Sequence, residues 1–381
     1  MTTPLYQDHN MPAKKPENAH SGLWFERFFN QFDDDNHWQI RKPLKGKDGK
    51  EHDPKKDWIN TVTGKIGSQK QLNEFQQRQQ TLIAALQGES HCYSTDWHFV
   101  TGMGNPHPVE NGFAWHPTLA VPYLAGSAVK GLVRAWVEMN EDGLSADENK
   151  ALLKRWFGTE AKGQAAEQAG DFIFFDALPG EPPVLLCDIM TPHMGKWYEQ
   201  GDSGSLNPNA IPADWHEPVP VPFLAVKKAP FIFSIAARNP DKQPDDVKEL
   251  ARVFDALNNA LLWLGAGAKT AAGYGYMTED KNFILELQAQ KDADDQAAQF
   301  AALTDAQKSV FKLAQDYGQA KAHPKTQPVG GQLNQLLTQT INQSGGWPSE
   351  DRQALWALGT KINETLWNNK NVKNRLKTLQ G

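Results

Sequence analysis

Residues 263–277 read WLGAGAKTAAGYGYM and contain four glycines, one lysine and two tyrosines. The stretch is not a phosphate-binding P-loop, GxxxxGK[ST], because Ala268 precedes Lys269 where that motif needs a glycine. It is not the dinucleotide fingerprint GxGxxG either, because Thr270 stands where the third glycine belongs. Both motifs follow a strand, whereas the residues before this stretch have the period of a helix. The stretch therefore predicts neither of these nucleotide-binding loops.

Two interpretations of the glycine-rich stretch remain open. Gly265 follows the last apolar residue of the helical pattern, where a left-handed glycine commonly ends a helix. The later glycines let one backbone lie against another or form a nest of N–H groups, and a lysine and a threonine suit a phosphate. Two tyrosines alternate with glycine, as in a strand whose rings stack on bases. The stretch is therefore either a tight turn or a contact with RNA or phosphate, and the residues concerned are Gly265, Gly267, Lys269, Thr270, Gly273, Tyr274, Gly275 and Tyr276.

Periodic patterns before this stretch predict the main elements. Two amphipathic helices are expected at 127–140, with Val129, Leu132, Val133, Trp136 and Val137 inside, and at 246–264, with Val247, Leu250, Phe254, Leu257, Leu261 and Leu264 inside. Strands are expected at 93–104, 171–180, 183–193, 221–226 and 230–239, the second and third joined by a proline–glycine turn. This order of elements is the one that an α+β sandwich of the ferredoxin-like (RRM-like) type needs, with the polar residues 195–218 as an insertion.

A second candidate site lies where the helix at 127–140 begins. Gly126 and Ser127 open this helix, and Ser127 as N-cap would leave N–H groups and the positive end of the helix dipole free for an anion. Lys130 and Arg134 are four residues apart and share the face opposite the apolar residues. An ordinary capped helix with two solvated cations would show the same pattern. Together with the glycine-rich stretch, the pattern predicts two phosphate sites on one scaffold.

The segments outside this scaffold have their own signatures. Residues 1–20 read as an extended polar arm and 22–32 as a strand or short helix on the core. Residues 41–56 read as a solvated loop or as a disordered excursion that touches nothing, and 67–88 as a glutamine-rich helix. Aromatic strands stop near residue 285, so the expected domains are 1–285 and a C-terminal helical bundle, 286–381. The last helix has few acidic residues and suits RNA or an acidic partner surface; its cations are Lys361, Lys370, Lys373, Arg375 and Lys377.

Bulk composition excludes several classes of protein. The chain has 381 residues and a formal net charge of −6, which excludes a basic protein that coats nucleic acid by bulk attraction. Two cysteines, Cys92 and Cys187, are too few for a disulfide framework or a zinc knuckle. Neither a signal peptide nor a run long enough for a membrane helix is present, so a soluble, cytoplasmic protein is expected. No carboxylate cluster has the spacing of a metal site, and no metal or cofactor is expected.

The motifs PYLAGSAVKGLVRA (122–135) and GAGAKTAAGYGYM (265–277) resemble the loop–helix signature and the glycine-rich loop of the RAMP superfamily of CRISPR proteins. The longer run at 100–136 is similar to the sixth-subunit family of the type III-B Cmr effector complex. The resemblance covers about residues 93–277 and departs from the signature at Ala125, where the usual residue is proline. It implies a modified ferredoxin-like fold and a non-catalytic subunit of an antiviral ribonucleoprotein near the three-prime end of the guide RNA. The implied partners are guide RNA, target RNA, backbone RAMP subunits and small helical subunits.

The resemblance also suggests which residues touch RNA. Phosphate contacts position RNA without reading its sequence, and base pairing with the guide supplies the specificity. The expected RNA-binding residues are Gly126, Ser127, Lys130, Gly131, Arg134, Gly265, Gly267, Lys269, Thr270, Gly273, Tyr274, Gly275 and His193. The insertion at 195–218, with Trp197, Tyr198 and Trp215, is either a thumb-like hairpin that wedges into the guide–target duplex or a surface loop.

Two alternatives belong to other functional classes. RNA-cleaving members of the superfamily use histidine as a general acid or base, and His98, His107, His116 and His193 fall near the expected RNA face. The first alternative is therefore a metal-independent endoribonuclease that uses His107 or His116. The second is a protein-interaction module built on the C-terminal bundle.

Overall fold

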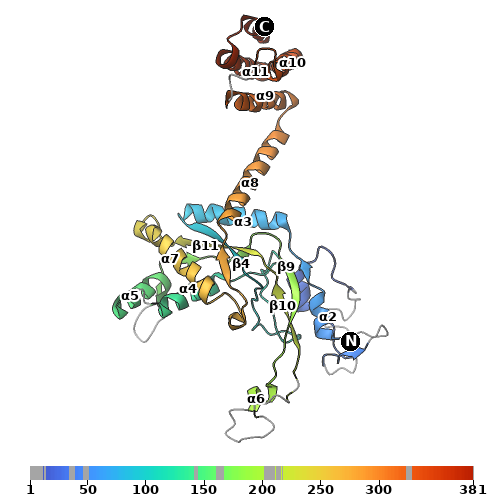
Figure 1. Ribbon diagram of the computed structural model, residues 1–381, viewed down its shortest axis with the longest axis vertical. Helices are drawn as coiled ribbons and strands as arrows, with labels where there is room; N and C mark the ends of the chain where they lie inside the picture. Colours follow the sequence, from blue (N-terminus) through green and yellow to red (C-terminus); the bar gives the residue numbers. More distant parts are fainter. Residues whose placement is uncertain are drawn as a thin grey trace. The chain divides into compact units, whose positions relative to one another are not determined.

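The computed structural model (Figure 1) describes residues 12, 14–33, 39–45, 51–140, 145–159, 167–200, 211, 216, 218–322 and 328–380. The chain divides into two compact units, residues 1–284 and 285–381. Helix α8 (Lys281–Ala302) crosses the boundary between them. None of the described helices is long and apolar enough to span a membrane.

An antiparallel sheet forms the centre of the first unit. Its path runs β12 (Met277–Glu279), β4 (Glu89–Thr95), β11 (Pro230–Ala237), β7 (Phe172–Phe174), and β8 (Leu178–Pro179) also pairs with β11. Helices α4 (Gly126–Met139) and α7 (Pro244–Trp263) pack against each other, and each contacts this sheet (Figure 1). The predicted combination of helices with antiparallel strands is confirmed.

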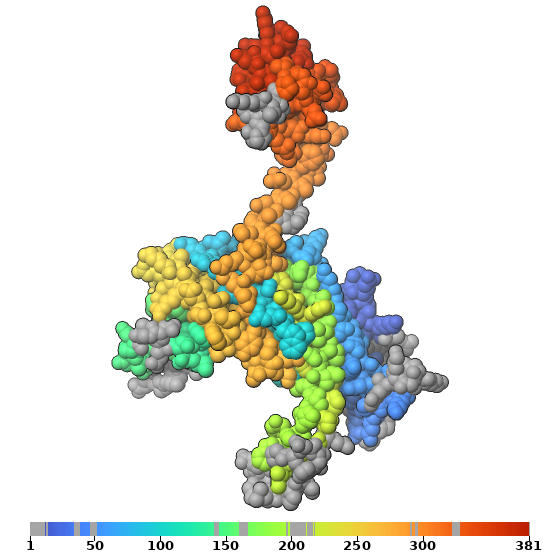
Figure 2. All heavy atoms as spheres, in the orientation of Figure 1, coloured from blue at the N-terminus to red at the C-terminus, as the bar shows by residue number. Residues whose placement is uncertain are grey.

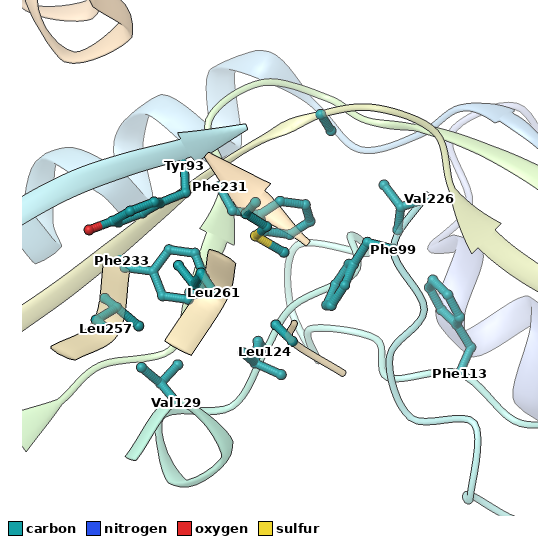
Figure 3. Packing of buried hydrophobic residues seen from close by; sticks show 14 of the residues in the cluster. Tyr93, Phe99, Phe113, Leu124, Val129, Val226, Phe231, Phe233, Leu257 and Leu261 are labelled. Carbon is teal, nitrogen blue, oxygen red and sulfur yellow. The ribbon is translucent and has the colours of Figure 1, made fainter. Parts of the chain in front are cut away.

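The core lies between this sheet and the two helices. Phe231 and Phe233 of β11 lie near Tyr93 of β4, and Leu257 of α7 and Val129 of α4 face them (Figure 3). On α4, Val129, Val133 and Val137 are buried, because residues four apart lie on the same side of a helix. The predicted inner faces of both helices are thus confirmed in their main positions, which include Leu250, Phe254 and Leu261 of α7.

A smaller sheet carries a hairpin. Its order is β10 (Val221–Val226), β9 (Val184–Met190), β3 (Gly64–Lys65), with Leu224 opposite Cys187. The strands β9 and β10 extend away from the body towards α6 (Gly195–Gln200) in Figure 1. The strands expected at 171–180 and 183–193 do not pair with each other: β7 and β8 pair with β11, and β9 pairs with β10. Pro182 and Pro183, between β8 and β9, lack the N–H donors that a ladder needs.

Shorter elements surround the two sheets. Residues 22–32 contain a helix, α1 (Ser21–Arg27), and the glutamine-rich helix is α3 (Gln69–Ala85). The expected loop at 41–56 instead includes β1 (Leu44–Lys45), β2 (Glu51–His52) and the start of α2 (Pro54–Asn60). Asp53 caps α2 by accepting the N–H of Lys55, and its Trp58 and Ile59 are buried. Helix α5 (Ala146–Phe157) precedes a pair of two-residue strands, β5 (Gly158–Thr159) and β6 (Gln168–Ala169).

The second unit is helical and has its own core. After α8 come α9 (Asp305–Ala322), α10 (Gln332–Gln343), α11 (Ser349–Ile362) and α12 (Lys370–Leu376), with single turns at Ser344–Gly346, Asn363–Trp367 and Lys377–Leu379. Its buried apolar cluster is separate from the core of the first unit and includes Leu313, Leu337, Leu355, Ile362, Val372 and Leu376.

Candidate nucleic-acid interface

Helix α4 begins at Gly126, and a carboxylate from the segment between β7 and β8 lies at its N-terminus. The N-cap position is Ala125, which has no side-chain cap, and the N–H of Gly126 donates to Asp176 Oδ1 at 2.7 Å. The prediction of Ser127 as N-cap is therefore wrong: Ser127 is exposed within the first turn. A Cβ at Gly126 would collide with the carbonyl oxygen of Phe174, so glycine is needed for this close approach. Part of the expected anion site is thus already filled by the protein's own carboxylate.

The outer face of α4 gathers cations around a glycine. Lys130 is half-buried. Its pKa is lowered first by burial and then by the positive charges of Arg238 and Arg134. Arg134 is exposed and pairs with Glu138 at 2.7 Å, while Arg238 donates from Nε to the carbonyl oxygen of Gly170. Gly131 lies between the lysine and Arg134 on the exposed face, and a Cβ there would meet nothing within 4 Å. This face therefore combines surplus positive charge with bare backbone.

The glycine-rich loop ends α7 and folds back on itself. Gly265 has φ +72° and donates its N–H to the carbonyl oxygen of Ala260, which confirms the predicted helix ending. Ala266 donates to the carbonyl oxygen of Gly275 at 2.8 Å, and Gly275 donates to that of His98 at 2.8 Å. A Cβ at Gly275 would collide with the carbonyl oxygen of Ala266. The tight-turn interpretation thus accounts for these two glycines.

The other two glycines of the loop differ from each other. Gly267 has φ +80°, and a Cβ there would collide with the carbonyl oxygen of Val100. Gly273 has φ +92°, is exposed, and would meet nothing within 4 Å. Of the four loop glycines, only Gly273 leaves open space at the surface, on the turn that follows the 3₁₀ helix Thr270–Ala272. Thr270, the first residue of this 3₁₀ helix, is half-buried.

Lys269 connects the loop with the root of the hairpin. It has φ +61°, its Nζ lies 3.2 Å from Met190 Sδ on β9, and the ammonium is 5.4 Å from the ring centroid of Phe223 on β10. Figure 2 shows the orange surface of this region beside the yellow-green surface of β9 and β10. Lys269 is half-buried, and its contacts with Met190 and Phe223 place its charge where the loop meets the hairpin.

Tyr274 supports the loop from inside. Its side chain is 7% exposed, and its hydroxyl donates to Asp188 Oδ2 on β9 at 2.7 Å. Burial, then the hydrogen bond and charge of Asp188, raise the pKa of Tyr274. The expectation that this ring stacks on a base as part of a strand differs from the structure, because β12 begins only at Met277 and the ring packs on Phe223.

An exposed aromatic that the sequence reasoning missed lies next to this tyrosine. Trp97 is 49% exposed, stacks on His98 with centroids 4.5 Å apart, and lies 4.9 Å from Tyr274. Burial lowers the pKa of His98 although Asp188 lies nearby, and its buried Nδ1 has no hydrogen-bond partner among the described residues. The strand expected at 93–104 ends at Thr95, so Trp97 lies in the bend that follows β4. Trp97 is thus an exposed ring at this site that can reach a ligand.

The remaining histidines have different surroundings. His107 donates from Nε2 to the carbonyl oxygen of Phe25 at 2.8 Å and accepts the N–H of Val109 at Nδ1. His116 is buried and accepts the N–H of Leu119 at Nδ1. His193 is exposed just after β9. His107 and His116 therefore brace loops through their ring nitrogens.

The tip of the hairpin is only partly described. Trp197 and Tyr198 on α6 are exposed, and so is Ile189 on β9. Trp215 lies outside the described residues. The described part of the hairpin therefore presents apolar side chains to solvent.

Comparison with known proteins matches part of the chain to one superfamily. Residues 94–278 match the RAMP superfamily. The chain is 27% identical over 255 residues to the CRISPR system Cmr subunit Cmr6 of Pyrococcus furiosus, an alignment that covers 52% of this chain and 70% of that protein. It is 27% identical over 179 residues to Cmr6 of Saccharolobus solfataricus, covering 46% of this chain and 51% of that protein, about half its length.

Solved structures include two relevant neighbours. A cryo-EM structure of the type III-B Cmr-beta bound to cognate target RNA aligns with a TM-score of 0.44 and 20% identity over 60% of this chain and 71% of that chain. The crystal structure of Cmr6 from Pyrococcus furiosus aligns with a TM-score of 0.28 and 22% identity over 51% of this chain and 98% of that chain. From the sequence matches, residues 94–278 are a domain of the RAMP superfamily, and the chain is homologous to Cmr6.

Proposed function

We propose that this chain is a non-catalytic, guide-RNA-binding subunit of a type III-B CRISPR effector complex. It would lie near the three-prime end of the guide and contact target RNA, backbone RAMP subunits and small helical subunits. Homology to proteins named as Cmr subunits supports membership of such a complex. The binding face would be the outer side of α4 together with the glycine-rich loop.

One observation carries the RNA-binding part of this proposal. Gly131 lies inside α4 on an exposed face, where glycine is about 1 kcal/mol less favourable than alanine. Nothing lies within 4 Å of the position of its missing Cβ, so packing within the protein does not require glycine there. A ligand that lies against the helix backbone does require it, and Lys130 and Arg134 on the neighbouring face of α4 supply charges for a phosphate.

The fold supports the same proposal at a coarser level. We propose that the larger sheet is ferredoxin-like, because β4, α4, β7, β11, α7 and β12 follow one another along the chain and the sheet order is β12-β4-β11-β7. The hairpin β9–β10 is then an insertion between the second and third strands, and its exposed Trp197 and Tyr198 suit the wedge role. The helical unit, with its own core, is proposed as a separate domain.

The test is binding of single-stranded RNA by the full chain, measured by fluorescence anisotropy at several salt concentrations. Lys130→Glu and Lys269→Glu should each weaken binding and reduce the slope of log affinity against log salt by about 1. The control is Lys248→Glu on α7, whose side chain is 76% exposed and pairs with Asp245. Equal affinities for wild type and both test variants would refute the proposed face.

A second variant separates binding from folding. Gly131→Gln introduces a better helix former, so the thermal stability of the chain should stay the same or rise. Its side chain would occupy the space next to Lys130, so RNA affinity should fall. The nuclease alternative is tested with the same RNA in the presence of a chelator: cleavage that disappears in His107→Ala or His116→Ala would contradict the non-catalytic proposal.

A further inference from the structure

A pocket of about 430 Å³ opens between α3 and the segment that joins β7 to β8. Its volume lies within the range of small-ligand sites, about 300–1,000 Å³. Helix α3 lies outside residues 94–278, so the pocket is built partly from chain that the superfamily match does not cover. The residues that line it are Phe75, Arg78, Gln79 and Leu82 from α3, Phe174 at the end of β7, and Phe175 and Asp176 from the joining segment.

The walls of the pocket combine flat rings with one cation. Phe75, Phe174 and Phe175 line the pocket, and all three are half-buried. The guanidinium of Arg78 lies 5.8 Å from the centroid of the Phe75 ring. Phe174 is backed by Phe157, with stacked centroids 5.9 Å apart. Aromatic rings and arginine planes are the groups on which proteins stack unpaired bases, because every base has a π-face.

Asp176 connects this pocket with α4. One of its oxygens, Oδ1, accepts the N–H of Gly126 at 2.7 Å, and its other oxygen accepts no hydrogen bond from the residues that the structure describes. That second oxygen can accept an amino or imino group of a base edge. The same carboxylate therefore holds the first turn of the cationic helix and borders the aromatic pocket.

We propose that this pocket takes one unpaired nucleobase of an RNA strand whose phosphates lie along α4. The inference rests on the proposed function, because it needs RNA on that helix. The base stacks on Phe75 and Arg78, and Asp176 accepts a hydrogen bond from its edge. This assigns to α3 a base-holding role in addition to the phosphate contacts of α4.

The experiment uses the full chain and a single-stranded RNA that carries 5-iodouridine at successive positions, because this base cross-links to aromatic side chains on irradiation. The cross-linked peptides are mapped by mass spectrometry. We expect cross-links to Phe75 or to the pair Phe174 and Phe175. Phe75→Leu, which keeps the apolar volume, should lower RNA affinity by about 5-fold or more, as loss of one stacked base does.

A matched pair of variants separates stacking from charge. Arg78→Ala and Lys70→Ala each remove one cation from α3, but the Lys70 side chain is 86% exposed and does not line the pocket. Cross-linking should fall several-fold in the first variant and stay unchanged in the second. Equal behaviour of the two variants, or cross-links confined to other segments, would overturn the pocket. If the chain does not bind the RNA, or binds it with no effect of Lys130→Glu, the proposed function fails instead.

Discussion

Substitution of Gly275 by alanine tests whether the glycine-rich loop is built for packing or for a ligand. Gly275 has φ +76°, and its Cβ would collide with the carbonyl oxygen of Ala266, whose N–H donates to the carbonyl of Gly275. Gly273 in the same loop has φ +92° but meets nothing within 4 Å. The two positions share a left-handed backbone and differ in packing.

The magnitude follows from these two contributions. A left-handed backbone is unfavourable by about 1–2 kcal/mol for a residue with a Cβ, and relief of the collision adds about 1–3 kcal/mol. Gly275→Ala should therefore lower the free energy of unfolding by about 3 kcal/mol, and Gly273→Ala by about 1 kcal/mol. At about 3 °C per kcal/mol for a unit of this size, the expected losses in Tm are about 9 °C and 3 °C.

The assay is thermal unfolding of the full chain, followed by circular dichroism, with RNA affinity measured on the folded proteins. Gly131→Ala is the third member of the series: it lies in a helix with open space around it, so it should raise stability by about 1 kcal/mol. Equal losses of stability in Gly273→Ala and Gly275→Ala would refute the assignment of the buried glycine to packing. A weaker RNA affinity in Gly273→Ala at nearly unchanged stability would support a ligand at the open one.

Three further predictions concern other parts of the chain. Burial lowers the pKa of His107, so the unfolded state binds a proton at a higher pH than the folded state, and the free energy of unfolding should fall as the pH drops below about 6.5. His107→Gln should make this fall less steep in urea unfolding measured at several pH values, and an unchanged pH dependence would contradict the role of burial. Tyr274→Phe removes the hydrogen bond to Asp188, so the free energy of unfolding should fall by about 1.5 kcal/mol and hydrogen exchange in β9 should become faster. The same free energy of unfolding and the same exchange rates in wild type and variant would show that the bond contributes nothing. Replacing both Lys370 and Lys373 on α12 by glutamate should weaken RNA binding at low salt without changing the melting temperature. An unchanged RNA affinity would argue that α12 does not contact RNA.

Local patterns predicted the parts of the fold that local physics controls. The helical period of apolar residues located α4 and α7, and Gly265 after the last periodic residue located the end of α7. Two local signals were available but not used: Ser145 and Glu148 form the capping box of α5, and Asp53 caps α2. These helices could therefore have been predicted from the sequence.

The errors at the candidate site come from contacts between distant residues. Ser127 had the chemistry of an N-cap, but Asp176, which bonds the first N–H of α4, comes about fifty residues later in the chain. The sequence suggested that Tyr274 stacks on a base, but its hydroxyl donates a hydrogen bond to Asp188 on β9 of the smaller sheet, and its ring is buried. Spacing along a sequence does not show which side chain a second element supplies, so the partners at the site required the structure.

The position of the hairpin in the chain has a consequence for variation among proteins built on this plan. The larger sheet is formed by β4, β11, β7, β12 and β8, and among the described strands none of these pairs with β9 or β10, which flank the tip of the hairpin. Doubling the length of such a connection raises the entropic free-energy cost of closing the loop by only about 0.6 kcal/mol. The reach of this arm can therefore be lengthened or shortened by insertions and deletions while the central scaffold keeps its shape, so one architecture can be fitted to assemblies of different spacing.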